Sequence, residues 1–302
     1  FDVIIIGAGI CGSMLARELS RYKLKIAVLD KENDIANGAT MANSAIVHTG
    51  YDPEDDTLKA RLNVRGARLY PDICKELNCK HKVVGAFVAA SGESEEENLD
   101  VLIDRAKRRE IEYEVLTGDE ARKIEPLLVD KITKVLSLPT TAVIYPWEVA
   151  ISCMQVAVRN GVQLYLNHEV DDIKKTAGKY EINAGGEVFE GKMILNAAGI
   201  GAEKMALMVS DKIDFVTKPK RGEYYLIDKD CHLVDRVIFP VPTEQGKGVL
   251  AIPTAYGNTL IGPNNQVIEE GATVATSDFG ANYIHEHIGR ILKEVPFNKS
   301  IR

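Results

Sequence analysis

The sequence predicts an α/β fold in which a discontinuous domain of alternating strands and helices is interleaved with a β-rich domain. Three observations predict it. A buried strand, a glycine-rich turn, a helix and a second strand follow one another over residues 2–30. A helix and further buried strands recur over residues 146–196. Segments with strand-like alternation and turn residues occupy the stretches 81–144 and 215–261.

Composition sets the class of protein. A chain of 302 residues is long enough for two domains. A net charge of -7 argues against a nucleic-acid partner, because phosphate binding requires a basic face. No apolar run reaches about 18 residues, so we expect at most peripheral membrane contact. The 5 cysteines are odd in number and scattered, which favours reduced thiols in a cytoplasmic protein and no metal site.

The first block opens the discontinuous domain. Residues 2–6 form an apolar run typical of a buried parallel strand, and we expect a few residues to precede it. Residues 7–12 read Gly-Ala-Gly-Ile-Cys-Gly, and a helix is predicted to continue to about Tyr22. A second strand follows from Lys25 to Asp30. This order of elements is that of a Rossmann-type βαβ unit.

The three glycines give the unit its chemistry. Gly7 permits the tight turn after the strand, Gly9 lets the backbone approach a pyrophosphate, and Gly12 lets the helix pack on the sheet. Phosphates are expected at the helix N-terminus, where N–H groups and the helix dipole favour negative charge. The alternative interpretation is a glycine-rich turn that merely joins a strand to a helix.

Asp30 distinguishes these interpretations, because a turn alone leaves it unexplained. It ends the second strand about 20 residues after the glycines, where a carboxylate accepts hydrogen bonds from ribose hydroxyls. It also repels a 2′-phosphate, which disfavours NADP. We include the next residue, Lys31, among the predicted cofactor-binding residues. The unit alone does not separate FAD from NAD.

The remaining elements follow from periodicity and turn residues. Residues 36–57 are rich in Asn, Gly, Thr and Asp and are predicted to form a long functional loop. Helices are predicted at 58–77, 93–109, 117–124, 146–160 and 281–295, and strands at 82–90, 163–166, 180–183, 187–190 and 192–196. The predicted domains are a nucleotide domain at 1–80 and 145–210 and a substrate domain at 81–144 and 211–302.

Two later segments carry a family resemblance. Residues 168–173 (His-Glu-Val-Asp-Asp-Ile) resemble the segment of two-dinucleotide-type flavoproteins in which a valine backbone holds the adenine, which implies this role for Val170. Residues 196–199 (Asn-Ala-Ala-Gly) resemble the second-strand motif of these proteins. Its small residues pass close to FAD, which implies contacts from Ala197, Ala198 and Gly199. The resemblance therefore favours FAD over NAD.

Residues 43–50 (Asn-Ser-Ala-Ile-Val-His-Thr-Gly) resemble the flavin-facing loop of the D-amino-acid-oxidase-like superfamily. The most similar subset is the glycerol-3-phosphate dehydrogenase and L-2-hydroxyglutarate oxidase group, and this implies cofactor contacts from Asn43 and Ser44. Residues 58–61, 220–225, 253–254 and 262–263 match the pattern of that group as well. A further FAD-contacting segment of the family would begin where this sequence stops, so we expect the sequence to be incomplete.

Two residues are the catalytic candidates. The loop resemblance brings His48 to the flavin, and its ordinary pKa suits a base that removes a hydroxyl proton. The alternative is a loop histidine that bonds backbone or flavin. Arg221 lies on a segment that the family turns toward the substrate, and a guanidinium suits capture of a carboxylate or phosphate. If Arg221 is structural, Lys59 and Arg61 are further anion candidates, although a solvated helix face explains them more simply.

The resemblance implies an FAD-dependent enzyme that oxidises a small anionic 2-hydroxy compound, with hydride passing to the flavin. Glycerol 3-phosphate is the first expected substrate and L-2-hydroxyglutarate the second; the electron acceptor is left open. An amino-acid oxidase is an alternative enzyme. A non-catalytic flavin-binding module of a larger redox complex is an alternative of another class.

Overall fold

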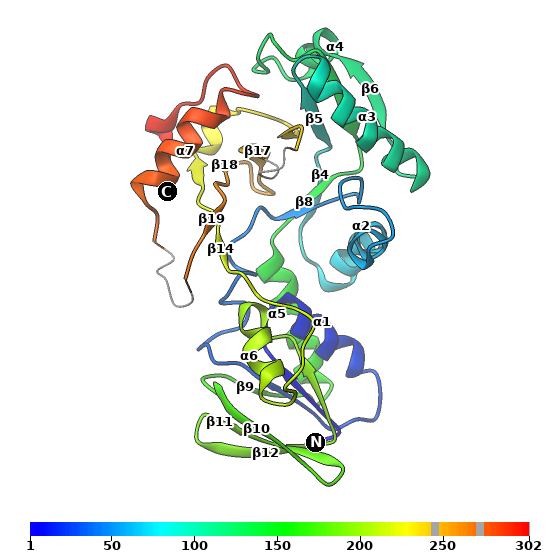
Figure 1. Cartoon of the computed structure of the whole chain (residues 1–302), viewed down its shortest axis with the longest axis vertical. Coiled ribbons are helices and arrows are strands. Elements are labelled where there is room, and N and C mark those ends of the chain that lie inside the picture. Colours follow the sequence, from blue (N-terminus) through cyan, green and yellow to red (C-terminus); the bar gives the residue numbers. More distant parts are fainter. Residues whose placement is uncertain (243–247, 270–274, 302) are drawn as a thin grey trace. The chain divides into compact units, whose positions relative to one another are not determined.

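The computed structural model describes residues 1–242, 248–269 and 275–301 (Figure 1). The chain divides into two compact units. Unit 1 comprises Phe1–Asn43 and Tyr145–Pro219, and unit 2 comprises Ser44–Ile144 and Lys220–Arg302. The predicted nucleotide domain ran to residue 80, whereas residues 44–80 lie in unit 2. The reason is strand pairing, because β3 (Ile46–Val47) and β4 (His81–Val83) both pair with β8 (Ala142–Ile144).

Unit 1 is built on a four-stranded parallel sheet of order β13-β1-β2-β9. Its strands are β1 (Val3–Ile6), β2 (Ile26–Leu29), β9 (Gln163–Tyr165) and β13 (Met193–Asn196). All four residues of β1 are buried, as expected of a parallel strand covered on both faces. The predicted opening βαβ unit is therefore present, although its helix, α1 (Ile10–Leu19), ends before the predicted Tyr22.

Alternate side chains of the sheet pack into two layers. On one face Val3, Ile5 and Val28 belong to one buried cluster with Ala16 of α1 and Met154 of the helix at Pro146–Arg159. On the other face Ile4 and Ile6 pack with residues of an antiparallel three-stranded sheet. The remaining elements of unit 1 are α5 (Pro146–Arg159), β10 (Val170–Thr176), β11 (Lys179–Ala184), β12 (Glu187–Gly191), η1 (Gly199–Gly201) and α6 (Ala202–Leu207). The strands predicted at 180–183 and 187–190 correspond to β11 and β12, which pair as an antiparallel hairpin.

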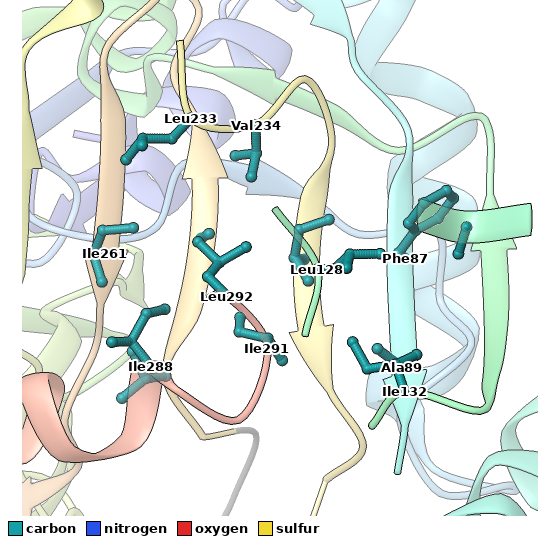
Figure 2. Close-up of a cluster of buried hydrophobic side chains, with 14 of the residues drawn as sticks. Phe87, Ala89, Leu128, Ile132, Leu233, Val234, Ile261, Ile288, Ile291 and Leu292 are labelled. Carbon is teal, nitrogen blue, oxygen red and sulfur yellow. The ribbon is translucent and has the colours of Figure 1, made fainter. Parts of the chain in front are cut away.

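Unit 2 contains a mixed sheet of order β15-β18-β17-β16-β5-β7-β6 over its described residues. Figure 2 shows its core, in which Phe87 and Ala89 of β5 and Ile261 of β18 lie with Ile288, Ile291 and Leu292. The strands of this sheet are β5 (Ala86–Ala90), β6 (Glu114–Thr117), β7 (Lys134–Leu138), β15 (Tyr225–Ile227), β16 (Val237–Pro240), β17 (Leu250–Pro253) and β18 (Thr259–Gly262).

The following elements of unit 2 do not belong to this sheet. They are α2 (Leu58–Leu77), α3 (Glu93–Arg108), α4 (Gly118–Ile124), β14 (Lys220–Arg221), η2 (Lys229–Cys231), β19 (Gln266–Val267), α7 (Asp278–Ile288) and η3 (Phe297–Lys299). The predicted strand at 82–90 was wrong in one respect, because Gly85, with φ of 71°, breaks it into β4 and β5. Across the described residues no helix is long and apolar enough to cross a membrane.

The predicted helix at 281–295 was also displaced. Ser277 caps α7 by accepting a hydrogen bond from the Gly280 N–H, so the helix begins at Asp278. It ends at Ile288, and the chain then turns to bury Ile291 and Leu292 in the core. The apolar residues after Ile288 that suggested a longer helix are therefore buried in a turn and not on a helix face.

Candidate functional site

The glycine-rich turn of unit 1 has the geometry of a phosphate-binding loop. Gly7 has φ of 105°, and a Cβ there would overlap the Ala197 carbonyl oxygen. A Cβ on Gly12 would overlap the Gly7 carbonyl oxygen, so the close approach of helix and strand also requires glycine. At Gly9 the nearest atom is Thr40 Oγ1, at 3.2 Å from an ideal Cβ. The backbone at Gly9 is therefore accessible to a ligand.

The N-terminus of α1 suits an anion. This helix, which the structure describes in full, has no acidic residue in its first turn and no side-chain cap. Its first N–H, that of Ile10, donates to Thr40 Oγ1 at 3.0 Å. Asn43 Nδ2 donates to the carbonyls of Ala39 and Thr40 and so holds this loop, which gives Asn43 a structural role. Thr40 was not predicted; a hydroxyl residue after Gly38-Ala39 in the polar loop was the available signal.

Asp30 has a structural use that the sequence did not reveal. Its carboxylate accepts hydrogen bonds from the N–H groups of Ala8, at 2.5 Å, and Glu32, at 2.8 Å. The glycine turn therefore explains Asp30 without a ligand. Each carboxylate oxygen keeps a further lone pair, so a ribose contact is compatible with this arrangement. The ammonium of Lys31 lies 3.7 Å from the carboxylate of Glu32, and its side chain is 60% exposed.

The two segments that resemble flavoproteins lie beside this turn. The His168 N–H donates to the Asp30 carbonyl at 2.8 Å, and the Ala197 N–H donates to the Ile6 carbonyl at 2.9 Å. The Val170 side chain is buried with the sheet. Ala198 and Gly199 continue from Ala197 into η1. The glycine turn, a helix N-terminus without acidic residues in its first turn, and these segments together fit a dinucleotide.

Unit 2 contains a cavity of about 310 Å³. Among its walls are three residues predicted from the sequence, Ser44, His48 and Arg221. Ser44, predicted as a cofactor residue, thus shares the cavity with both catalytic candidates. The other lining residues are Lys220, Gly222, Gly248, Leu250, Pro263, Asn264, Asn265 and Tyr283, and sequence analysis proposed none of them for the site. Lys59 and Arg61 are exposed on α2 and are not among the described lining residues.

Tyr224 supports the cavity through Ser44. The two hydroxyl oxygens lie 2.7 Å apart. Burial raises the pKa of Tyr224, and the hydrogen bond with Ser44 opposes this only in part, so the phenol stays protonated at neutral pH. Tyr225 faces another neighbour, with its ring 4.9 Å from that of Phe297. Neighbouring side chains of an extended segment point to opposite sides, so Tyr224 and Tyr225 contact different partners.

His48 follows β3 and is held from two sides. Its carbonyl oxygen accepts a hydrogen bond from Asn63 Nδ2 at 3.1 Å. Its imidazole ring lies 5.6 Å from the ring of Phe239 on β16. A histidine whose backbone and ring are both fixed presents its nitrogens in a defined direction, as proton transfer requires.

The segment after His48 is held by arginines at the end of α3. Arg109 donates to the carbonyl oxygens of Gly50 and Pro53 and to Asp55 Oδ1, the last two at 2.6 Å. Arg105 donates to the Asp52 carbonyl at 2.8 Å. Sequence analysis missed these residues because the two segments are remote along the chain.

Arg221 lies at the cavity, but much of its guanidinium is committed to the protein. Nη1 donates to the Ala275 carbonyl at 3.0 Å and Nη2 donates to Gln266 Oε1 at 2.7 Å. An anion bound here would share these donors with the acceptors on Ala275 and Gln266. The neighbouring Gly222 is confined, because Pro263 Cβ lies 2.9 Å from the position of its missing Cβ.

Comparison with known proteins identifies the family. Residues 2–301 match the family described as FAD dependent oxidoreductase (DAO). The chain belongs to this family. The match confirms the predicted resemblance and its cofactor, FAD. The mixed α/β architecture also matches the dithionite-reduced L-α-glycerophosphate oxidase of Mycoplasma pneumoniae with FAD bound, with a TM-score of 0.93, 28% identity and coverage of 100% of this chain and 81% of that one.

Named members of the family are similar over most of the chain. Glycerol 3-phosphate dehydrogenase of Caloramator mitchellensis is 40% identical over 100% of the chain, which spans 63% of that relative's length. Glycerol 3-phosphate oxidase of Mycoplasma pneumoniae is 33% identical over 92% of this chain and 75% of its own length. Human mitochondrial L-2-hydroxyglutarate dehydrogenase is 27% identical over 95% of this chain and 66% of its own.

Proposed function

We propose that the protein is an FAD-dependent enzyme that oxidises a small anionic 2-hydroxy compound, with glycerol 3-phosphate as the first candidate. The observation that carries the proposal is the cavity of unit 2, in which His48 is combined with two cationic side chains, Lys220 and Arg221. Relatives named for glycerol 3-phosphate are 40% and 33% identical, and the human relative named for L-2-hydroxyglutarate is 27% identical. This order supports glycerol 3-phosphate first.

The cofactor site that we propose lies in unit 1. Gly7, Gly9 and the N-terminus of α1 would hold the pyrophosphate, and Asp30 would accept from the ribose. Val170 would contact the adenine through its backbone, by resemblance to the flavoprotein pattern. The remaining contacts that we propose in unit 1 are Lys31, Asn43, Ala197, Ala198 and Gly199. When bound, FAD supplies the acceptor for a hydride from the substrate C–H.

The side chains of the cavity would prepare the substrate. Lys220 and Arg221 would bind its anionic group, and Asn265 would offer its amide to a hydroxyl group. His48 would remove the hydroxyl proton as the C–H bond breaks, and Phe239 would keep its ring in place. Binding in one orientation lowers the barrier because the reacting groups no longer need to find each other.

Anaerobic bleaching of the flavin absorbance tests the proposal. The panel comprises glycerol 3-phosphate, L-2-hydroxyglutarate, glycine and L-proline. We expect glycerol 3-phosphate to bleach the flavin fastest. Bleaching by L-2-hydroxyglutarate alone would identify that compound as the substrate instead. Bleaching by an amino acid alone would indicate an enzyme that oxidises amines and not hydroxy compounds. A flavin that every compound leaves oxidised would favour a non-catalytic flavin-binding module.

Repeating the productive reaction with molecular oxygen and with an artificial acceptor addresses the electron acceptor. The named relatives include both a dehydrogenase and an oxidase. Rapid reoxidation by oxygen would favour an oxidase, and turnover only with the artificial acceptor would favour a dehydrogenase.

A further inference from the structure

A buried carboxylate, Glu223, joins several parts of the cavity wall. It lies between β14 and β15, and only 6% of the residue is exposed. Its Oε2 accepts a hydrogen bond from Asn264 Nδ2 at 2.5 Å, and its Oε1 accepts one from the Ser277 N–H at 2.5 Å. Its own N–H donates to Asn264 Oδ1 at 2.7 Å. Glu223 and Asn264 therefore hold each other through two hydrogen bonds.

The same carboxylate balances a charge of the cavity. Arg221 Nε lies 3.9 Å from Glu223 Oε2, and the two side chains are 14% and 5% exposed. A buried carboxylate is stable only when it is paired and hydrogen-bonded, and this one has both kinds of partner. Arg221 and Asn264 line the cavity, whereas Glu223 is not among the described lining residues. It therefore lies behind the wall.

The helix that supplies another part of the wall starts at the same point. Ser277, the N-cap of α7, donates to Glu223 through its N–H and also through its hydroxyl at 3.2 Å. Tyr283 of that helix lines the cavity. The fit against the helix is tight, because a Cβ on Gly280 would overlap Glu223 Oε2 and lie 2.8 Å from Asn264 Nδ2. The carboxylate has no room to shift toward α7.

We propose that Glu223 is the positioning residue of the anion-binding wall, a role that rests on the proposed function. It fixes Asn264 by direct hydrogen bonds and Arg221 by charge, and it anchors the start of α7. It acts through these residues and does not touch the substrate. Substitution should therefore weaken binding of the anionic group more than it slows the chemical step.

The test compares three variants of the FAD-loaded protein. Glu223→Gln keeps the shape of the side chain but removes its charge and presents a donor to the Asn264 amide. Gly280→Ala adds a methyl group on α7, at a residue that does not line the cavity, and this methyl group would displace the Glu223 carboxylate. Glu125→Gln is the matched control, because Glu125 is also a buried carboxylate of unit 2, 3% exposed and bonded to the N–H groups of Asp235 and Arg236.

The readouts are the KM and kcat for glycerol 3-phosphate, the Kd of inorganic phosphate by calorimetry, and Tm. We expect Glu223→Gln and Gly280→Ala each to raise KM and Kd about tenfold while kcat stays within about twofold. Glu125→Gln should change Tm alone. An unchanged KM and Kd in Glu223→Gln overturns the positioning role and leaves the proposed function standing. An equal rise of KM in Glu125→Gln also overturns the positioning role alone. A wild-type protein that neither oxidises glycerol 3-phosphate nor binds phosphate overturns both.

Discussion

The guanidinium of Arg109 donates a hydrogen bond to the carbonyl oxygen of Gly50, two residues after His48. The same group also holds Pro53 and Asp55. Arg109→Ala removes all three contacts, so we expect the free energy of unfolding to fall by about 2–4 kcal/mol. If His48 is the base, kcat should fall at least about tenfold as well, because its loop loses its fixed position.

Arg108→Ala is the control for this prediction. Arg108 lies on the same helix end and its guanidinium bonds Asp55 Oδ2, yet its side chain is 56% exposed. We expect a change of less than about 1 kcal/mol and an unaltered kcat, as for most exposed ion pairs. Thermal unfolding and steady-state kinetics measure both. Equal effects of the two substitutions would show that the Arg109 contacts do not order the loop.

Gly9→Val should abolish FAD binding while the protein stays folded. A side chain at Gly9 meets little besides Thr40 Oγ1, but it would occupy the space expected for the pyrophosphate. Flavin absorbance and circular dichroism measure the two properties. Gly66→Val is the control, since a Cβ there has no neighbour within 4 Å among the described atoms. Full FAD occupancy in Gly9→Val would mean that the phosphate loop lies elsewhere.

Arg221 and Lys220 should respond differently to substitution. Arg221 is bonded to Ala275 and Gln266, so Arg221→Ala should lower Tm and also weaken substrate binding, by about 2–5 kcal/mol in kcat/KM. Arg221→Lys should recover only part, because an ammonium does not reproduce the guanidinium geometry. Lys220 is exposed, and Lys220→Ala should raise KM about tenfold with little change in Tm. Unaltered KM values in both alanine variants would show that neither Lys220 nor Arg221 binds the anionic group of the substrate.

Glu125 should make stability depend on pH. Burial raises its pKa from 4.5 to about 7, against the opposing effect of the N–H groups of Arg236 and Asp235. The folded protein therefore keeps a proton that the unfolded chain loses between these values. The free energy of unfolding should fall as pH rises from 4.5 to about 7 and then level off, by up to about 3 kcal/mol.

Thermal unfolding of wild type and Glu125→Gln across this range measures the contribution. The glutamine variant has no charge to bury, so its Tm should gain on that of the wild type as pH rises. A constant difference between the two proteins over the whole range would contradict the raised pKa.

Local patterns predicted the parts of the fold that local physics determines. The strand, glycine turn and helix of residues 2–19 follow from burial and from backbone freedom at Gly7, and the structure repeats them. The long helix at 58–77 was predicted with its observed bounds from its periodicity, and the structure adds Thr57 as its N-cap. Asp30 was singled out from its place after a strand, yet its contacts with Ala8 and Glu32 were not foreseen.

Contacts between distant segments could not be predicted. Arg221 was selected for its chemistry, but its acceptors Gln266 and Ala275 lie 45 and 54 residues away and depend on the pairing of β14 with β19. Glu223 was not singled out, because nothing in the neighbouring sequence shows that its carboxylate will contact Asn264 and Ser277. Residues 44–80, predicted as part of the nucleotide domain, cluster with unit 2 because β3 pairs with β8, about 100 residues later.

The parallel pairing of β5 with β16 constrains how the chain is made. Ile238 pairs with Phe87, so two adjacent strands of the sheet in unit 2 are separated in the sequence by residues 145–219, which belong to unit 1. During synthesis one edge of β5 should stay unpaired until β16 emerges from the ribosome. By then β13, the partner of β1 in unit 1, has already been synthesised. Nascent chains arrested before residue 237 should therefore aggregate readily, and chaperone demand should end only after β16 is released.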